Sequence, residues 1–420
     1  MSPVRPDVHV VGRRLDPEHH RLRDLLTRAA QPYEWHEAGS AQADELLARH
    51  GLSGAELPVL VDGAHAHTGV TVERLLDLWN LSAPPSRSEY DLAIVGAGPA
   101  GLAAAVYAAS DGLSTVVLER DLPGGQASHT SLIENFFGFP DGIGGAELAR
   151  LAGRQAERFG AELVFRGVVG DSRDGGGTHR LEVAGGHELT ARVTVAAPGM
   201  DWRRLDVDGV HELLGRGVYY GAGRSEAVQC GGDDVLVVGA GNSAGQAVLN
   251  LGNAGARVTM LVRGDRLGRT MSAYLVKRIE QHPLIEVRYM TQVRELHAGT
   301  QLDAVTVEGP GGHQRLPAAA LFICIGGQPR TGWAGDAGVD LDPAGYVLTG
   351  PDLLEAGRRP PAWPLDRDPL VLETSVPGLF AAGDVRHGST KRMAGAVGEG
   401  AMAAALAHRR LDELEHAAGS

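Results

Sequence analysis

Short apolar runs and helical spacings alternate over the first 82 residues. Three runs have the length and composition of strands, and three other stretches repeat their apolar residues every three to four positions. The predicted strands are residues 8–11, 33–35 and 57–62. The predicted helices are residues 20–30, 41–50 and 71–81. This order predicts a small α/β unit, and the polar, proline-containing residues 82–88 predict an exposed linker after it.

A different pattern begins at residue 90. An apolar run at 92–95 leads into closely spaced glycines, an alanine-rich helical stretch and a second apolar run at 115–118. Strand, glycine turn, helix and strand together bind a dinucleotide, because glycine lets the backbone approach the pyrophosphate and the helix N-terminus offers it amide groups. The residues expected to contact the dinucleotide are Gly96, Gly98, Pro99, Ala100, Gly101 and, as the ribose acceptor, Glu119. This motif alone leaves FAD and a nicotinamide cofactor both open.

The same pattern returns later in the chain. A strand at 235–238 is followed by a glycine turn, a helix to about residue 254 and a strand at 257–262. Two such units predict two dinucleotides, one bound permanently and one visiting. The expected contacts of the second unit are Gly239, Gly241, Asn242, Ser243 and Ala244.

Three arginines follow the last strand of the second unit. Arg263, Arg266 and Arg269 stand where an NAD-binding unit would carry a carboxylate. Guanidinium groups can hold a 2′-phosphate through paired, charge-assisted hydrogen bonds, which predicts NADPH rather than NADH. The alternative is that these arginines are solvated loop charges, and Asp265 between them favours it.

Composition narrows the class of protein. The 420 residues, 43% of them hydrophobic and 22% charged, predict a globular chain of several domains. The net charge of −13 argues against nucleic acid or an anionic membrane surface as a partner. The two cysteines, Cys230 and Cys324, provide neither a disulfide framework nor metal-ligand spacing, so no metal is expected. With no secretory leader pattern and no long apolar run, we expect a cytoplasmic protein.

Further motifs carry a family resemblance. Residues 122–127 form a glycine-rich loop, Asn135 precedes a Gly-Phe-Pro turn, and Gly383-Asp384 follows a buried apolar run. Together with the two dinucleotide motifs, they resemble the low-molecular-weight thioredoxin reductases, class II pyridine nucleotide-disulfide oxidoreductases. The resemblance implies FAD in the first unit, NADPH in the second and a homodimer. The further FAD contacts it implies are Gly125, Gln126, Asn135, Gly383, Asp384, Lys391, Arg392 and Met393. It also implies a helix from residue 398 to about 414, directed at the flavin, with Glu399 in its first turn as a candidate cap.

The resemblance fails at the residues that define the reaction. The family carries a Cys-x-x-Cys pair before its second dinucleotide motif, and here Gly221 and Arg224 occupy those two positions. Neither residue can form a mixed disulfide. Cys230 is a candidate for a lone redox thiol, with ordinary burial as the alternative. Tyr219, Tyr220 and Arg224 are candidates for an acceptor site beside the flavin, and Cys324 is expected to be a buried packing residue.

The N-terminal unit resembles a glutaredoxin or thioredoxin fold. Its order of elements matches, and Pro58 stands where those folds carry a cis-proline. The position of the redox Cys-Pro-x-Cys is held by Asp16-Pro17-Glu18-His19, which excludes thiol exchange. We interpret this unit as a module for docking or dimer packing, with a small-ligand site as the alternative.

The expected fold is α/β, with two Rossmann-like dinucleotide-binding domains after the small N-terminal domain. The boundaries are residues 1–82 for the N-terminal domain, 83–89 for the linker, 90–204 and 327–420 for the two parts of the FAD domain, and 205–326 for the NAD(P)H domain. Residues 356–369 are expected to form an irregular insertion.

The function implied is that of an FAD-dependent oxidoreductase. Electrons would pass from NADPH through flavin to an unidentified small-molecule or protein acceptor, without a dithiol relay. One alternative is a ferredoxin- or flavodoxin-NADP reductase. An alternative of another class is a redox sensor or scaffold that binds FAD and NADPH without turnover.

Overall fold

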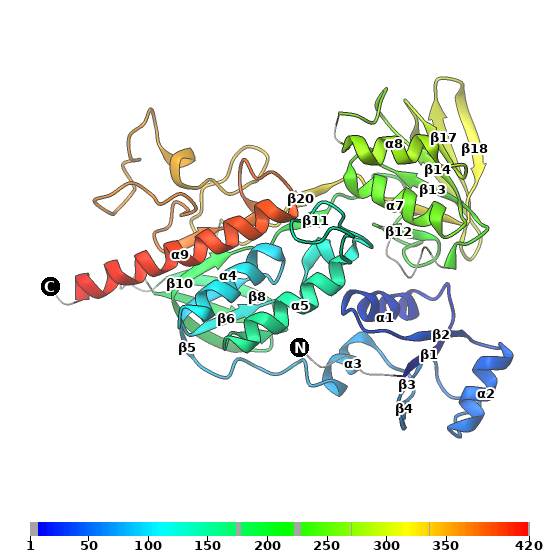
Figure 1. The fold of residues 1–420 in the computed structure, drawn as a ribbon, viewed down its shortest axis with the longest axis horizontal. Coiled ribbons are helices and arrows are strands. Elements are labelled where there is room, and N and C mark those ends of the chain that lie inside the picture. Colours follow the sequence, from blue (N-terminus) through cyan, green and yellow to red (C-terminus); the bar gives the residue numbers. More distant parts are fainter. Residues whose placement is uncertain are drawn as a thin grey trace.

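The computed structural model describes residues 7–173, 178–221, 227, 229–269, 271–335 and 337–418. Three α/β units follow one another along the chain, and the C-terminal segment returns to the second of them (Figure 1). No helix among the described residues is long and apolar enough to cross a membrane.

The N-terminal unit has a four-stranded sheet in the order β2-β1-β3-β4. Its elements are β1 (Val8–Gly12), α1 (Pro17–Arg28), β2 (Glu34–Glu37), α2 (Ala41–Arg49), β3 (Val59–Asp62), β4 (His65–His67) and α3 (Val72–Leu78). All six predicted elements are present, the strand β4 is additional, and the peptide bond before Pro58 is cis. Helix α1 begins three residues earlier than expected because the Asp16 carboxylate caps it, accepting hydrogen bonds from the amides of Glu18 (3.0 Å) and His19 (3.3 Å).

The second unit contains the first dinucleotide motif. Its sheet has the order β7-β6-β5-β10-β9-β8, and β21 pairs with β10. The strands are β5 (Glu89–Val95), β6 (Thr115–Leu118), β7 (Glu162–Val164), β8 (Val168–Arg173), β9 (His179–Val183), β10 (His187–Ala196) and β21 (Leu379–Ala381). The helices are α4 (Pro99–Ser110), η1 (Gly125–His129), α5 (Gly145–Arg158), η3 (Gly383–Val385) and α9 (Met393–Ala418). Residues 356–369 contain no helix or strand, as expected.

The third unit contains the second dinucleotide motif on a parallel sheet of order β12-β19-β13-β14-β15. This sheet comprises β12 (Val218–Tyr220), β13 (Asp234–Val238), β14 (Arg257–Leu261), β15 (Ile285–Arg288) and β19 (Ala320–Ile323), with α7 (Asn242–Asn253) and α8 (Ala273–Gln281). A separate antiparallel sheet is formed by β16 (Gln292–Ala298), β17 (Leu302–Gly309) and β18 (Gly312–Pro317). Where the chain crosses between the second and third units, β11 (Met200–Trp202) pairs with β20 (Gly327–Pro329), and η2 (Gly350–Leu353) follows on the return.

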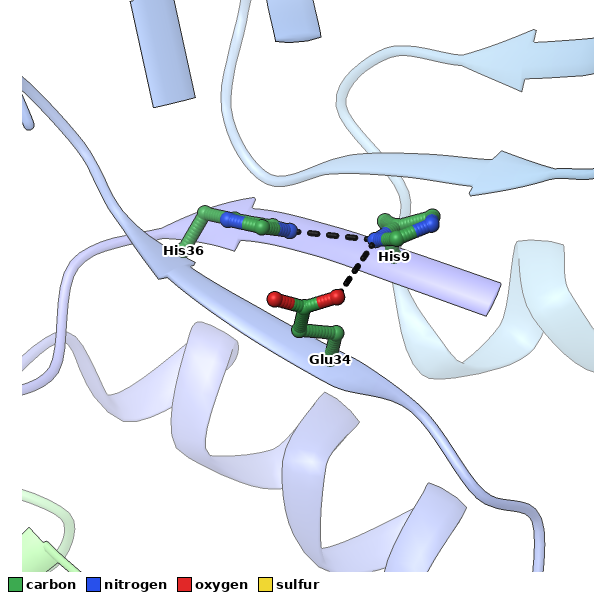
Figure 2. A group of neighbouring side chains, drawn as sticks. All are labelled: His9, Glu34 and His36. Carbon is green, nitrogen blue, oxygen red and sulfur yellow. Dashed lines mark hydrogen bonds and ion pairs between the residues drawn. The ribbon is translucent and has the colours of Figure 1, made fainter. Parts of the chain in front are cut away.

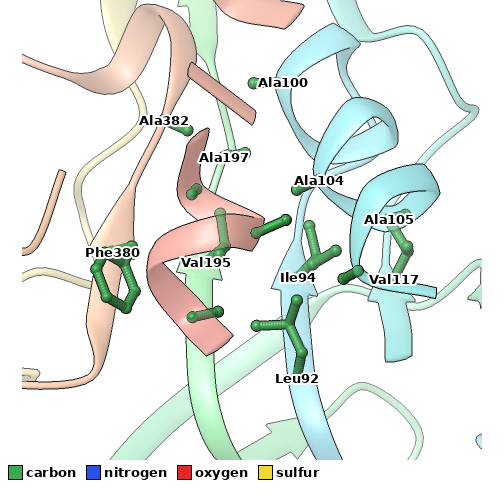
Figure 3. Packing of buried hydrophobic residues seen from close by; sticks show 14 of the residues in the cluster. Leu92, Ile94, Ala100, Ala104, Ala105, Val117, Val195, Ala197, Phe380 and Ala382 are labelled. Atoms are coloured by element: carbon green, nitrogen blue, oxygen red, sulfur yellow. The ribbon is translucent and has the colours of Figure 1, made fainter. Parts of the chain in front are cut away.

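Helix α9 packs closely along α4, and both cover the sheet of the second unit (Figures 1 and 3). The contact uses small residues, because a Cβ on Gly400 would lie 2.0 Å from the carbonyl oxygen of Ala100. Helix α9 starts at Met393, earlier than the predicted residue 398. Packing of α9 against α4 outweighs the weak helix propensity of the glycines at 395 and 398.

We predict that Gly400→Ala destabilises the protein while Gly398→Ala does not. The added methyl group at residue 400 would have to push α9 away from the α4 backbone, at a cost of about 1–3 kcal/mol. At the exposed residue 398, a Cβ would meet no described atom within 4 Å, so alanine should be neutral or stabilising by up to about 1 kcal/mol. Chemical denaturation followed by circular dichroism measures both changes, and equal stabilities would contradict the packing argument.

Candidate functional site

A cavity of about 490 Å³ opens where the two dinucleotide motifs face each other. It is bordered by the N-terminal ends of α4 and α7, by η1, by the crossing strand β11 and by the segment that leads into α9. Its size lies within the range of cofactor pockets, about 300–1,000 Å³.

The first glycine motif shapes one wall of this cavity. Gly96 has φ +103°, and a Cβ there would lie 2.3 Å from the carbonyl oxygen of Ala197, so no larger residue fits. Gly98 is the N-cap of α4 and has no side chain to cap the helix, which leaves its first amides available to an anion. A Cβ on Gly101 would collide with the Gly96 carbonyl oxygen at 1.8 Å, so this glycine serves packing of the helix on the strand.

Glu119 lies in the wall of the cavity and is 7% exposed. Its carboxylate accepts hydrogen bonds from the amides of Ala97 (2.7 Å) and Asp121 (3.0 Å), which connects the glycine turn to the end of β6. Burial raises the pKa of Glu119, and these two hydrogen bonds only partly oppose that shift. The carboxylate oxygens retain lone pairs that can accept from a ribose hydroxyl.

Most of the predicted FAD contacts are brought together around the cavity. Those that line it are Gly98, Pro99, Ala100, Glu119, Gly125, Gln126, Asn135, Gly383, Asp384, Lys391, Arg392 and Met393. Gly96 and Gly101 are not among the described lining residues, and they support the cavity through their backbone packing. The amide of Gln126 donates to the Met200 carbonyl (3.0 Å), and the Lys391 ammonium donates to the Asp384 carbonyl (2.6 Å). Burial raises the pKa of the Asp384 carboxyl, and the nearby Lys391 ammonium opposes this shift only in part.

Glu399 does not cap α9, contrary to the sequence prediction. Because the helix begins at Met393, Glu399 lies beyond the first turn. Its carboxylate accepts from the Gly383 amide (2.7 Å) and from the Arg386 guanidinium (2.8 Å). This residue therefore fixes the loop that presents Asp384 to the cavity.

The second glycine motif borders the same cavity. Asn242 and Ser243, at the start of α7, line it together with Gln246 and Tyr274. Gly239 allows close packing, since a Cβ there would lie 2.2 Å from the Cys324 carbonyl oxygen. Gly239, Gly241 and Ala244 are not among the described lining residues. Both helix N-termini thus point toward one space.

Two side-chain contacts hold the second and third units in this orientation. Arg278 on α8 forms an ion pair with Glu134 (2.8 Å), and the Gln246 amide donates to the Leu132 carbonyl (3.3 Å). The three predicted phosphate-binding arginines, Arg263, Arg266 and Arg269, are exposed after the carboxyl end of β14. Asp265 is 3.9 Å from Arg269.

The predicted acceptor residues lie elsewhere. Tyr219 is 9% exposed and stacks on Phe322, with ring centroids 5.3 Å apart. The Tyr220 hydroxyl accepts from the Leu205 amide (3.1 Å). Neither tyrosine is among the described residues that line the cavity, so the hypothesis that they shape an acceptor site beside the flavin is not supported. The third candidate, Arg224, lies outside the described residues.

Cys230 and Cys324 are both buried, and neither forms a disulfide. The Cys230 sulfur lies 3.9 Å from an Arg14 guanidinium nitrogen of the N-terminal unit and packs in the core of the third unit. Burial raises the pKa of Cys324 to about 12. Cys324 directly follows β19 and packs in the core of the third unit, as expected.

Helix α1 lies beside the two dinucleotide units (Figure 1), and its side chains contact both of them. At its C-terminal end, Arg28 pairs with Asp121 (2.7 Å), donates to the Ser128 hydroxyl (3.2 Å) and borders the cavity. At its N-terminal end, the His20 ring packs edge-on against Tyr219 at 4.9 Å. Just before the helix, Arg14 pairs with Asp233 (3.1 Å).

Sequence reasoning missed several residues of the cavity wall. Arg28, His129, Trp202, Gln246 and Arg330 all border it. None belongs to a glycine motif, and Arg28 comes from another unit. His129 and Gln246 lie on η1 and α7, within about one turn of predicted contacts, whereas Arg28 reaches the cavity only through the packing of the N-terminal unit on the second unit.

The described residues fit FAD and NADPH. A cradle formed by Gly98 and Gly125, the uncapped amides of α4 and the buried Glu119 carboxylate match an adenosine pyrophosphate. The start of α7 offers the equivalent N-terminus to a second dinucleotide.

Comparisons with known proteins agree with this site. The family model described as pyridine nucleotide-disulphide oxidoreductase matches residues 90–400. Thioredoxin reductase of Bacillus subtilis (strain 168) is 32% identical over 333 residues, 78% of this chain and 96% of that protein. Thioredoxin reductase of Treponema pallidum (strain Nichols) is 33% identical over 336 residues, 78% of this chain and 99% of that protein. The crystal structure of Lactococcus lactis thioredoxin reductase in the FR conformation has a TM-score of 0.68 at 29% identity, covering 77% of this chain and 99% of that one.

Fold and site thus define a flavoprotein with two facing dinucleotide-binding units. The chain belongs to the pyridine nucleotide-disulphide oxidoreductase family and is similar to its thioredoxin reductases. It is an FAD-dependent NADPH oxidoreductase, with FAD and NADPH as its cofactors. The N-terminal unit lies outside the residues that the family model matches.

We predict that neither cysteine reacts with a thiol reagent in the folded protein. An ordinary thiol, with a pKa of 9.0, becomes reactive as the pH rises toward that value, whereas Cys324 should stay protonated until the pH approaches about 12. Burial should protect Cys230 as well. Labelling with iodoacetamide at mildly alkaline pH, with and without urea, and mass spectrometry measure this. Ala48→Cys, at an exposed position of α2, provides a reactive control. Rapid native labelling of Cys230 would restore the lone-thiol hypothesis.

Proposed function

We propose that this enzyme passes electrons from NADPH through FAD to its acceptor without a dithiol relay. The observation that carries the proposal is that the N-termini of α4 and α7, the two dinucleotide sites, border one cavity. Bound FAD supplies the two-electron carrier, and the protein holds the two cofactors toward each other. Arg278 and Gln246 support this orientation from the nicotinamide unit.

The absence of a thiol pair supports a direct route. Gly221 stands at one of the two positions where thioredoxin reductases carry a redox cysteine, and Arg224 stands at the other. Neither Cys230 nor Cys324 is exposed, so neither can readily contact an external disulfide. A disulfide acceptor, which the names of the relatives suggest, would have to approach the cavity itself.

The N-terminal unit supports a fixed geometry rather than a mobile one. The first residue of α1 packs against the third unit, because a Cβ on Gly215 would lie 2.9 Å from the Cα of Pro17. Gly215 lies in the turn before β12, and His20 of α1 packs against Tyr219 on that strand, two residues before Gly221. The N-terminal unit therefore lies close to the position where thioredoxin reductases carry the first redox cysteine. We therefore assign it a docking role within the chain. A homodimer through the FAD-binding unit is part of the proposal, on the family resemblance.

The acceptor test starts from anaerobic reduction of the purified flavoprotein by NADPH. We expect single-phase bleaching of the flavin, since no slow domain rotation is needed, and reoxidation by ferredoxin, flavodoxin, a quinone, oxygen or a small metabolite rather than by a dithiol-dependent partner. Cys230→Ser should reduce and reoxidise at the same rates as the wild type. Two phases with a slow step, or loss of turnover in Cys230→Ser, would contradict the proposal. A flavin that stays oxidised would favour the sensor or scaffold alternative.

Arg263→Ala should weaken the binding of NADPH and leave the binding of NADH almost unchanged. The exposed guanidinium after β14 is proposed to bind the 2′-phosphate, and loss of a charge-assisted contact worth about 1.5–3 kcal/mol should raise the KM for NADPH roughly ten- to a hundredfold. Arg257→Ala is the control, because Arg257 lies at the other end of the same strand and pairs with Asp234 at 2.6 Å. The rate of flavin reduction at varied NADPH or NADH concentration measures the KM for each nucleotide in both variants. Comparable wild-type turnover with the two nucleotides would remove the argument.

A further inference from the structure

Three potential metal ligands meet on the sheet of the N-terminal unit, away from the cofactor cavity. His9 on β1 and Glu34 and His36 on β2 offer ligand atoms that all lie within 4.8 Å of one another. Figure 2 shows the three side chains converging on one point. Within the described residues, this is the one such group of three or more histidines, cysteines or carboxylates.

Strand pairing brings the three residues together. Strands β1 and β2 are parallel, with His9 opposite Glu34 and Val11 opposite His36. Because side chains alternate along a strand, Glu34 and His36 lie on the same face, and His9 joins them from the neighbouring strand. Val8 and Val10 point to the other face, into the core with α1 and α3.

The site is open on one side. Helix α2 covers Val11 on this face of the sheet through Ala43 and Leu46, whereas His9 and Glu34 keep side-chain exposures of 29% and 67%. An ion can therefore reach the cluster from solvent, and water can complete its coordination.

The spacing of the ligand atoms suits a tetrahedral ion. Nδ1 of His9 lies 3.1 Å from Nε2 of His36 and 3.4 Å from Oε2 of Glu34. Zinc binds imidazole nitrogen and carboxylate oxygen at about 2.0–2.2 Å, so two ligand atoms at a tetrahedral angle stand roughly 3.3–3.5 Å apart. The two measured separations are close to that range.

We propose that His9, Glu34 and His36 form a binding site for a divalent transition-metal ion, with Zn²⁺ as the ion whose ligand chemistry fits best. Two imidazoles and one carboxylate are a common zinc ligand set, and they leave a fourth position for water. The ion joins the edge strand β2 to β1. Because it binds only the folded sheet, it stabilises the N-terminal unit.

No metal was expected from the sequence, because the two cysteines lack metal-ligand spacing, whereas this cluster contains no cysteine. His9 is distant in sequence from the Glu-x-His pair of β2, and only the parallel pairing of β1 with β2 brings them into register.

The test uses the full-length, FAD-loaded protein without an affinity tag, dialysed against a chelator and titrated with ZnCl2. We expect saturable binding of one Zn²⁺ per chain and a rise in the unfolding temperature. Co²⁺ in place of Zn²⁺ should give the absorption of tetrahedral cobalt at wavelengths beyond the flavin bands. Absence of saturable binding, or six-coordinate cobalt, would overturn the proposal.

Three variants distinguish Zn²⁺ binding at this cluster from Zn²⁺ binding elsewhere on the protein surface. Glu34→Gln keeps the size of an exposed side chain, and His36→Ala removes an imidazole. Each should weaken Zn²⁺ binding at least about tenfold, because even outer-shell changes at metal sites cost about ten- to a hundredfold. His65→Ala, on β4 of the same sheet, is the control and should bind Zn²⁺ like the wild type. Circular dichroism and flavin content verify folding, and Glu34→Gln decides the outcome if His36→Ala does not fold. Equal weakening by His65→Ala, or unchanged binding in Glu34→Gln, would contradict the assignment.

Discussion

Both dinucleotide-binding units depend on a backbone approach that only glycine permits. The backbone group that approaches Gly96 is the Ala197 carbonyl, and the one that approaches Gly239 is the Cys324 carbonyl. In each unit this contact lies between the first strand and its helix, so it sets where the helix N-terminus points. The small residues of the α4–α9 interface continue the same principle, with the backbone of one helix reaching the backbone of another. These approaches fix where α4 and α7 begin, and the contacts between the second and third units, including the Arg278–Glu134 ion pair, bring the two helix starts to one cavity.

The fold was largely predictable because its signals are local. Apolar strands, glycine turns and the helix spacing each occupy a short stretch, and the structure has both dinucleotide units where the sequence predicted them. Errors occurred where a long-range contact decided the outcome. Packing against α4 moved the start of α9 to Met393, and this in turn gave Glu399 a different partner from the one expected.

The candidate site was predictable only in part, for the same reason. Residues that follow a glycine motif, such as Glu119 and Asn242, line the cavity as expected. Arg28 could not be found, because its place depends on how the N-terminal unit packs on the next one. The surroundings of Tyr219 could not be predicted either, because one of its neighbours is His20, a residue far away in the sequence.

The position of helix α1 changes the mechanics of the molecule. If only β11 and β20 joined the two dinucleotide units, this strand pair would be a narrow hinge. Rotation of one unit against the other about this hinge would then be the easiest motion of the molecule. Helix α1 adds a third support, because its two ends are attached on opposite sides of that hinge by Arg28 and by His20. Rotation of the nicotinamide unit would have to carry the whole N-terminal unit with it or separate one end of this helix. On the proposed docking role, the small unit without redox thiols would act as a brace and would stiffen the motion in which the two cofactor sites move apart.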